Sequence, residues 1–252
     1  LSYPRLFMAV DPRQSPSEAF IGIAADDTRS MVEDTMGDVA NFELTTVHRF
    51  TPQILELIKH VHHMFPAFDL GSDWEVDLSE VESVQKDGPV PALISASTQA
   101  ASDIDIYQSV QDLYSRGRMA LAVVDARQWR RFSELASQLS QSGKFHVSAI
   151  SGRSDIEGLG YRNRGLVVGA AEYLAGLQFD SVLVAGVPDL RSDSVTANEK
   201  TRILSLLYLA LSRAESEVRV FVNEEDGGAA DVLIQAVSKG LMQSARGSLS
   251  RS

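Results

Sequence analysis

The sequence predicts an α/β fold in which helices cover both faces of a mostly parallel central sheet. Short runs rich in Val, Ile and Leu alternate along the chain with longer stretches of helical period, the pattern of parallel strands connected by helices. With 252 residues, 44% of them hydrophobic, the chain can bury a substantial core. No internal repeat and no convincing linker divides it, so one main domain is expected.

Seven segments are expected to form strands. Each is a short apolar run, and most end at Asp, Gly, Ser or Asn, residues that favour turns. The expected strands are Leu6–Val10, Leu93–Ala96, Ala120–Val124, His146–Ile150, Leu166–Ala170, Val182–Ala185 and Val218–Val222. Because open α/β sheets bind ligands outside the carboxyl ends of their strands, ligand-binding loops are expected at those ends.

Five longer segments have the period and end signals of helices. In the first, Thr51 can cap the helix, Pro52 suits its first turn, and an apolar stripe runs to Phe65. Thr196 and Glu199 have the spacing of a capping box. The expected helices cover residues 51–65, 106–115, 126–140, 196–213 and 229–239.

Two segments are expected to lie at the surface. Gly71–Pro91 is acidic and poorly periodic, which predicts a loop or a small insertion. The Ser- and Arg-rich stretch Gln243–Ser252 is predicted to be a disordered tail.

Composition excludes several classes of protein. The net charge of -11 argues against wrapping nucleic acid by electrostatics alone, so any such contact must be local or shared. The absence of cysteine removes disulfides, thiolate metal sites and cysteine nucleophiles. The apolar runs are too short to cross a bilayer and the first residues do not resemble a signal peptide, so a cytoplasmic protein with no membrane partner is expected.

The segment Leu206–Ala214 (LLYLALSRA) carries the strongest motif signal. Preceded by Asn198-Glu199, it resembles the sixth motif of UvrD/Rep-type superfamily 1 DNA helicases, an acidic start leading to YVALTRA. The resemblance implies a RecA-like domain with three αβα layers, in which Arg213 is a catalytic arginine finger aimed at the phosphates of a nucleotide in a neighbouring RecA-like domain. On spacing alone, Arg213 is as well explained as a basic residue favoured by the helix dipole.

The segment Gly176–Asp180 (GLQFD), followed by an apolar run, resembles the fifth motif of the same family, KGLEFD. The resemblance implies that Gly176 and Gln178 bind the nucleotide. Ala175 stands where lysine is usual, and Gln178 stands where glutamate is usual; Gln178 can still hydrogen-bond a ribose hydroxyl, but without charge. A Gly-Leu turn before a buried strand explains the same residues.

Two further segments resemble family motifs. Val47–Thr51 (VHRFT) is similar to the fourth motif, NYRS, which implies that Arg49 reaches the nucleotide phosphates and that His48 replaces a tyrosine stacked near the adenine. The alternative for Arg49 is a solvated residue before a helix cap. The segment around Asp11–Ser15 (DPRQS) is similar to the third motif, GDxxQSI, in which the glutamine, here Gln14, is catalytic and couples the γ-phosphate to bound DNA.

The third motif closes the first RecA-like domain in this family. Residues 1–20 are therefore expected to end a preceding RecA-like domain, and residues 21–242 to form the C-terminal one. A phosphate loop is missing, because the only Gly-Lys pair, Gly143-Lys144, has Gln138 at the first glycine position and Phe145 after the lysine. ATP and Mg²⁺ then require an N-terminal RecA-like domain supplied outside this chain, and the chain alone is expected not to hydrolyse ATP.

The resemblance also implies single-stranded or partly duplex DNA as a partner and a place in DNA repair. Candidate DNA contacts are the basic and aromatic loop at Tyr161, Arg162 and Arg164, with Glu172 and Tyr173 after the next strand; a solvated loop is the plainer interpretation. His60, His62 and His63 lack a complete ligand set on one helix face, so no metal site is expected.

Two functions remain open at this point. The first is the C-terminal motor domain of an ATP-dependent DNA helicase. The second is a catalytically degenerate helicase-fold module that acts in protein interaction or regulation, which Ala175, Gln178, His48 and the net acidity favour.

Overall fold

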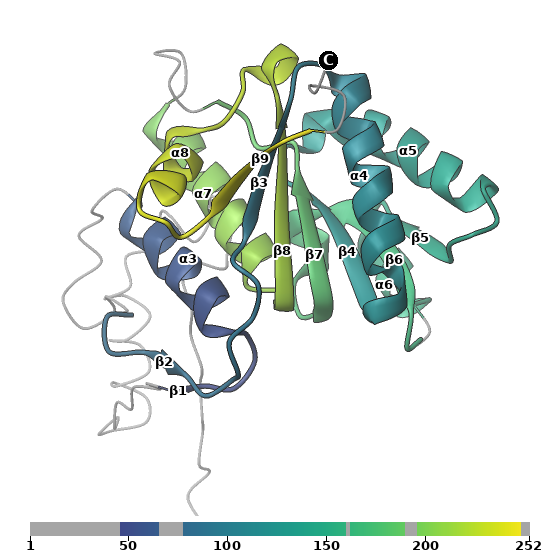
Figure 1. Ribbon diagram of the computed structural model, residues 1–252. Helices are drawn as coiled ribbons and strands as arrows, with labels where there is room; N and C mark the ends of the chain where they lie inside the picture. The colour runs from purple at the N-terminus through teal and green to yellow at the C-terminus, as the bar shows by residue number, and fades with distance from the viewer. Residues whose placement is uncertain (1–45, 66–77, 160–161, 190–195, 248–252) are drawn as a thin grey trace, which may run out of the picture.

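The computed structural model describes residues 46–65, 78–159, 162–189 and 196–247 (Figure 1). The expected strand at Leu6–Val10 and the candidate residues Gln14 and Tyr161 lie outside the described residues.

The centre of the molecule is a seven-stranded sheet in which all pairings are parallel, in the order β5-β6-β4-β7-β8-β3-β9. This confirms the predicted α/β fold and its parallel sheet. The strands are β3 (Ala92–Ala96), β4 (Arg118–Val123), β5 (Val147–Ile150), β6 (Gly165–Ala170), β7 (Phe179–Ala185), β8 (Ala214–Asn223) and β9 (Gln243–Arg246). A separate two-stranded pair joins β1 (Thr46–Val47) to β2 (Glu82–Ser83).

Helices cover both faces of the sheet. Figure 1 shows α4 and α5 on one side and α3, α7 and α8 on the other. The helices are α3 (Pro52–His63), α4 (Gln99–Leu113), α5 (Trp129–Gln141), α6 (Arg153–Glu157), α7 (Ala197–Leu211) and α8 (Asp231–Ser238), with short 3₁₀ turns at η3 (Tyr114–Arg116), η4 (Ala126–Gln128), η5 (Ala171–Leu174) and η6 (Glu224–Asp226).

Strand β4 shows how the sheet contributes side chains to two hydrophobic cores. Ala120 and Ala122 face the core shared with α3, α7 and α8, whereas Met119, Leu121 and Val123 face the core shared with α4 and α5. Because side chains alternate along a strand, a strand covered on both faces must be apolar at every position. This explains the continuous apolar run and gives the three αβα layers that the sequence predicts.

Helix α4 begins seven residues before its expected start at residue 106. Its first turn, Gln99–Ser102, has no large apolar side chain, but Thr98 has extended backbone angles and its Oγ1 accepts a hydrogen bond from Ala101 N at 3.1 Å. A side-chain cap of this kind supplies one of the partners that the first amides of a helix lack. Apolar periodicity, which located the helix in the sequence, does not register a turn stabilised in this way.

The tail predicted to be disordered from residue 243 is ordered in its first four residues. Strand β9 pairs with β3 in parallel, with Gln243 N donating to Pro91 O at 2.8 Å and Gly247 N donating to Ser95 O at 2.9 Å. All four β9 side chains are exposed, so the strand depends on backbone pairing and leaves no hydrophobic pattern in the sequence. This expectation was therefore wrong for residues 243–246.

The predicted loop at 71–91 carries β2 at Glu82–Ser83. Within the described ranges, no helix has the combined length and apolar character that crossing a membrane requires.

Candidate functional site

Residues of the motif-like segments line a cleft of about 1050 Å³. One wall is the junction of β1 and α3, a second is the stretch from Leu78 to Pro89, and the third is formed by the residues that enter β7 and β8. His48, Arg49, Gln178, Ser212 and Glu215 line it.

Backbone hydrogen bonds bring the three motif-bearing segments together. Phe179 N, at the start of β7, donates to Arg213 O at 3.0 Å, and Thr51 N, the cap of α3, donates to Glu215 O at 3.1 Å. The residue before β7, Gln178, therefore lies beside the end of α7 and beside Arg49.

The Arg49 side chain reaches both neighbouring segments. Its Nη1 donates to the carbonyl of Ser212 at 3.4 Å, across 163 residues of sequence. The Gln178 amide, with its oxygen toward Arg49, accepts from Arg49 Nε at 3.1 Å and Nη2 at 3.3 Å, and its nitrogen donates to Glu215 Oε1 at 3.3 Å. The reverse orientation would set donor against donor and acceptor against acceptor, so the neighbours decide the orientation of this amide.

Arg49 contributes a cation to the cleft. Within residues 46–65, 78–159, 162–189 and 196–247, no carboxylate forms an ion pair with it, and its partners are a carbonyl and an amide oxygen. A guanidinium with neutral partners retains its charge for an anion such as phosphate.

His48 lies next to Arg49 with its side chain exposed and lines the same cleft. Its backbone carbonyl accepts a hydrogen bond from the Gln85 side chain, and Ser83 Oγ donates to Phe50 O at 2.6 Å. Strand β2 and the stretch after it therefore hold in place the segment that carries His48 and Arg49.

Arg213 has a different position from the one expected of an arginine finger. The residue is only 4% exposed, and its guanidinium folds back on the end of α7, with Nη2 donating to Ser212 Oγ at 2.9 Å and Nε to Leu209 O at 3.3 Å. It is not among the residues that line the cleft. The bond to Leu209 O satisfies one of the last carbonyls of α7, which fits the plainer interpretation of a basic residue at a helix C-terminus.

Gly176 and Asp180, at the two ends of the GLQFD segment, shape the turn into β7. Gly176 has φ of +82°, a left-handed conformation that side chains disfavour. Asp180 Oδ2 accepts from Arg118 N at 2.7 Å at the start of β4, and a Cβ at Gly117 would collide with that carboxylate. Asp180 therefore joins the starts of two neighbouring strands.

The motif-bearing segments meet at the amino ends of the strands, because Gln178 immediately precedes β7 and Arg213 immediately precedes β8. The expectation of binding loops at the carboxyl ends does not describe this cleft. The segments that enter β7 and β8 meet the N-terminus of α3 here, which a rule based on sheet topology alone does not foresee.

The four described DNA-contact candidates do not form one surface. Arg162 and Arg164 are exposed before β6, whereas Glu172 and Tyr173 are half-buried in η5, after the other end of that strand. Six strand residues separate the two pairs, about 20 Å at 3.3 Å per residue.

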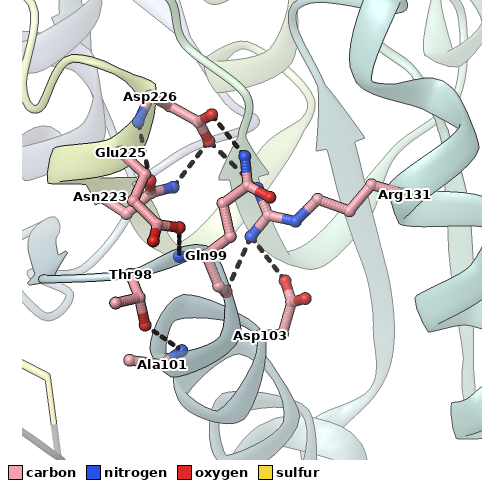
Figure 2. Close-up of polar contacts among 8 residues, drawn as sticks. All are labelled: Thr98, Gln99, Ala101, Asp103, Arg131, Asn223, Glu225 and Asp226. Atoms are coloured by element: carbon pink, nitrogen blue, oxygen red, sulfur yellow. Dashed lines mark hydrogen bonds and ion pairs between the residues drawn. The ribbon is translucent and has the colours of Figure 1, made fainter.

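The carboxyl ends of β3 and β8 carry a polar cluster that sequence reasoning missed. Figure 2 shows Arg131 of α5 between Asp103 of α4 and Asp226 of η6, with Nη2 2.7 Å from Asp103 Oδ1 and Nη1 3.1 Å from Asp226 Oδ2. Gln99 donates to Asp226 Oδ1 at 2.8 Å, and Asn223 donates to Asp226 Oδ2 at 2.7 Å. Donors and acceptors largely satisfy one another, so the cluster joins α4, α5 and η6. The polar residues at the end of a strand and at the start of a helix are a signal in the sequence for such a cluster. Arg131 is distant from them in sequence, so no local pattern indicates that it joins them.

His60 and His62 of α3 contact neighbouring helices and aromatic rings. His60 Nε2 lies 2.9 Å from Val232 O and its Nδ1 lies 3.3 Å from Lys239 Nζ, while the His62 ring packs near Phe65 and Tyr208. In the part of the chain that the structure describes, no three His, Asp or Glu side chains are grouped to hold a metal ion.

Comparisons with known proteins identify the fold. No protein-family model matches the chain and no curated protein matches it. Among solved structures, the C-terminal domain of a possible DNA helicase from Lactobacillus plantarum WCFS1 aligns with a TM-score of 0.51 and 20% identity, over 78% of this chain and 98% of that chain. The C-terminal domain of the DEAD-box protein Dbp5 aligns with a TM-score of 0.41 and 14% identity, over 62% and 89%, too distant a match to carry an argument. The first likeness shows the RecA-like fold and no more than the fold.

Proposed function

We propose that this chain is the second RecA-like motor domain of an ATP-dependent, UvrD-like DNA helicase or translocase. The observation that carries the proposal is the meeting of Arg49, Gln178 and the end of α7 at one cleft. Three segments that resemble helicase motifs are far apart in the sequence, and unrelated motif matches would have no reason to converge.

In this proposal ATP lies between the cleft and a phosphate-loop domain supplied outside this chain. Arg49 faces the phosphates and stabilises the charge that spreads over them during transfer. Magnesium is held mainly by the phosphate-loop domain, whose sequence signature this chain lacks. The resemblance to the third motif implies that Gln14 couples the γ-phosphate to bound DNA. Gln14 lies outside the described residues.

Arg213 acts as the arginine finger only after its guanidinium leaves the end of α7, where Ser212 Oγ and Leu209 O are among its acceptors. The phosphates of ATP are anionic and are therefore stronger acceptors for a guanidinium than the neutral Ser212 Oγ and Leu209 O. Docking of the partner domain with its nucleotide therefore favours movement of the Arg213 guanidinium from the end of α7 to the phosphates.

DNA contacts in this proposal are local, at exposed Arg162 and Arg164.

The packed position of Arg213 also favours the second candidate, a degenerate helicase-fold module that regulates or binds a protein partner. In that case Arg213 is a permanent helix-end residue, and the loss of lysine and glutamate at Ala175 and Gln178 reflects lost catalysis.

The test is ATP hydrolysis with and without single-stranded DNA, by this chain and by the same chain joined to a phosphate-loop domain. We expect DNA-stimulated turnover only in the joined protein, reduced by Arg213→Ala about 10³-fold, as for other arginine fingers, and by Arg49→Ala about 10-fold or more. Arg130→Ala, which removes an arginine whose side chain is 92% exposed, is the matched control. Turnover insensitive to Arg213→Ala and Arg49→Ala would remove the motor proposal, and no turnover in the joined protein would favour the degenerate module.

A further inference from the structure

Arg49 is held by neutral oxygens rather than by a carboxylate. The amide oxygen of Gln178 lies 3.1 Å from Arg49 Nε, and the carbonyl of Ser212 lies 3.4 Å from Nη1. Each acceptor fixes one edge of the guanidinium without cancelling its charge. The group is therefore oriented and still able to attract an anion.

Glu215 and Arg49 together favour one orientation of the Gln178 amide. Its Oε1 lies 3.3 Å from the Gln178 amide nitrogen, and an ionised carboxylate can only accept, so it selects the amide orientation with the oxygen toward Arg49. Glu215 is itself placed by the backbone, because its carbonyl accepts from Thr51 N at 3.1 Å.

We infer that Gln178 and Glu215 are positioning residues for Arg49: Glu215 orients the Gln178 amide, whose oxygen holds the Arg49 guanidinium in the cleft as an uncancelled cation for phosphate. The inference rests on the proposed function, since it specifies how the cleft recognises the phosphates of ATP. A glutamate at position 178 would pair with Arg49 and add a second negative charge beside Glu215, so the neutral amide of Gln178 leaves more of the Arg49 charge available to phosphate.

The first experiment uses this chain joined to a phosphate-loop domain, as in the turnover test, and compares its ATP affinity with that of its variants at position 178 by equilibrium titration. Gln178→Met keeps the size of the side chain and removes the amide, and we expect the Kd for ATP to rise about fivefold, as for the loss of one hydrogen bond. Gln178→Glu should raise it further, about tenfold or more. Gln178 is exposed, so both variants should remain folded.

The second experiment isolates Glu215 with a matched pair. Glu215→Gln and Glu215→Ala both remove the charge, but only glutamine keeps an oxygen that can accept from the Gln178 amide. We expect Glu215→Gln to bind ATP about threefold more tightly than Glu215→Ala. The Arg49 Nε–H resonance reports position directly: it should exchange slowly with water in the wild type and in Glu215→Gln, and faster in Gln178→Met.

Arg49→Ala distinguishes a failure of the positioning inference from a failure of the proposed function. If it raises the Kd for ATP while the position-178 variants bind as the wild type does, the positioning inference is overturned and the proposed function stands. If Arg49→Ala has no effect, or the wild type does not bind ATP, the proposed function fails and the inference about phosphate fails with it.

Discussion

Gln178 and Asp180 belong to one motif-like segment and have separate tasks in the folded chain. Gln178 points into the cleft and contacts Arg49, whereas Asp180 accepts the Arg118 backbone amide and joins the starts of β4 and β7. A motif match therefore mixes residues that contact a ligand with residues that shape the strand entry, and only the contacts separate them.

Asp180→Ala should lower stability without changing ATP affinity. It removes a 2.7 Å hydrogen bond to a carboxylate, which at this half-buried position is worth about 1–2 kcal/mol. Urea denaturation would show the loss, and Asp180→Asn, which retains an acceptor oxygen, should lose less. A large change in ATP affinity with unchanged stability would contradict the structural role of Asp180.

His60 gives the chain a predictable response to acid. Burial lowers the pKa of His60 below its ordinary value of 6.5, the hydrogen bond with Val232 O opposes this by raising the pKa, and the positive charge of Lys239 and the neighbouring His63 lower it further. The pKa in the folded chain is thus below that in the unfolded chain, so protonation favours unfolding. The contribution of His60 is complete above pH 6.5 and is lost as the pH falls toward its folded-state pKa.

The unfolding free energy of the wild type should fall more between about pH 7.5 and pH 5.5 than that of His60→Gln. Denaturant unfolding at the two pH values measures the difference. His146→Gln, at an exposed position far from α3 in sequence, is the control. Identical slopes for the wild type and His60→Gln would contradict the assignment.

At the scale of elements, β9 shows that a strand can form without a hydrophobic face. Gln243 N donates to Pro91 O just before β3, and Gly247 N donates to Ser95 O in β3. Because the donating side alternates along a strand, the N–H of Ala245 faces β3 as well, whereas that of Ser244 faces away. The edge of the sheet is held by this backbone ladder.

Ala245→Pro should therefore destabilise the chain by about 1–3 kcal/mol, because proline removes an N–H that faces the ladder. Ser244→Pro introduces the same ring one residue earlier, where the N–H faces away from β3, and should cost clearly less. Thermal unfolding of the two variants provides the comparison. Equal losses would mean that β9 does not pair in the observed register.

At the scale of the whole molecule, the cleft and the polar cluster around Arg131 lie at opposite ends of the strands. The cleft is formed by the residues that lead into β7 and β8, and the cluster is formed by the residues that follow β3 and β8 (Figures 1 and 2). The cluster joins α4, α5 and η6 on one side of the core, and its role is to hold these elements together.

Arg131→Met should lower the unfolding free energy by about 1–2 kcal/mol, because Asp103 and Asp226 lose their shared cation and both remain partly solvated. Arg130→Met, on the same helix but 92% exposed, should change stability by less than about 0.5 kcal/mol. Chemical denaturation measures both. An unchanged unfolding free energy in Arg131→Met would show that the cluster is a consequence of the packing and does not stabilise it.

The sequence by itself determined the α/β class, the parallel strands from β3 to β8, most helix cores and the segments that meet at the cleft. These features depend on local period and composition, which neighbouring residues carry. The tertiary structure alone decided that Arg49 pairs with Gln178, that Arg213 folds back on α7, that β9 completes the sheet and that Arg131 joins two carboxylates. Apart from the local fold-back of Arg213, these depend on pairings between distant positions, such as the 163 residues between Arg49 and Ser212. The energy of each pairing exists only once the sheet has brought the segments together.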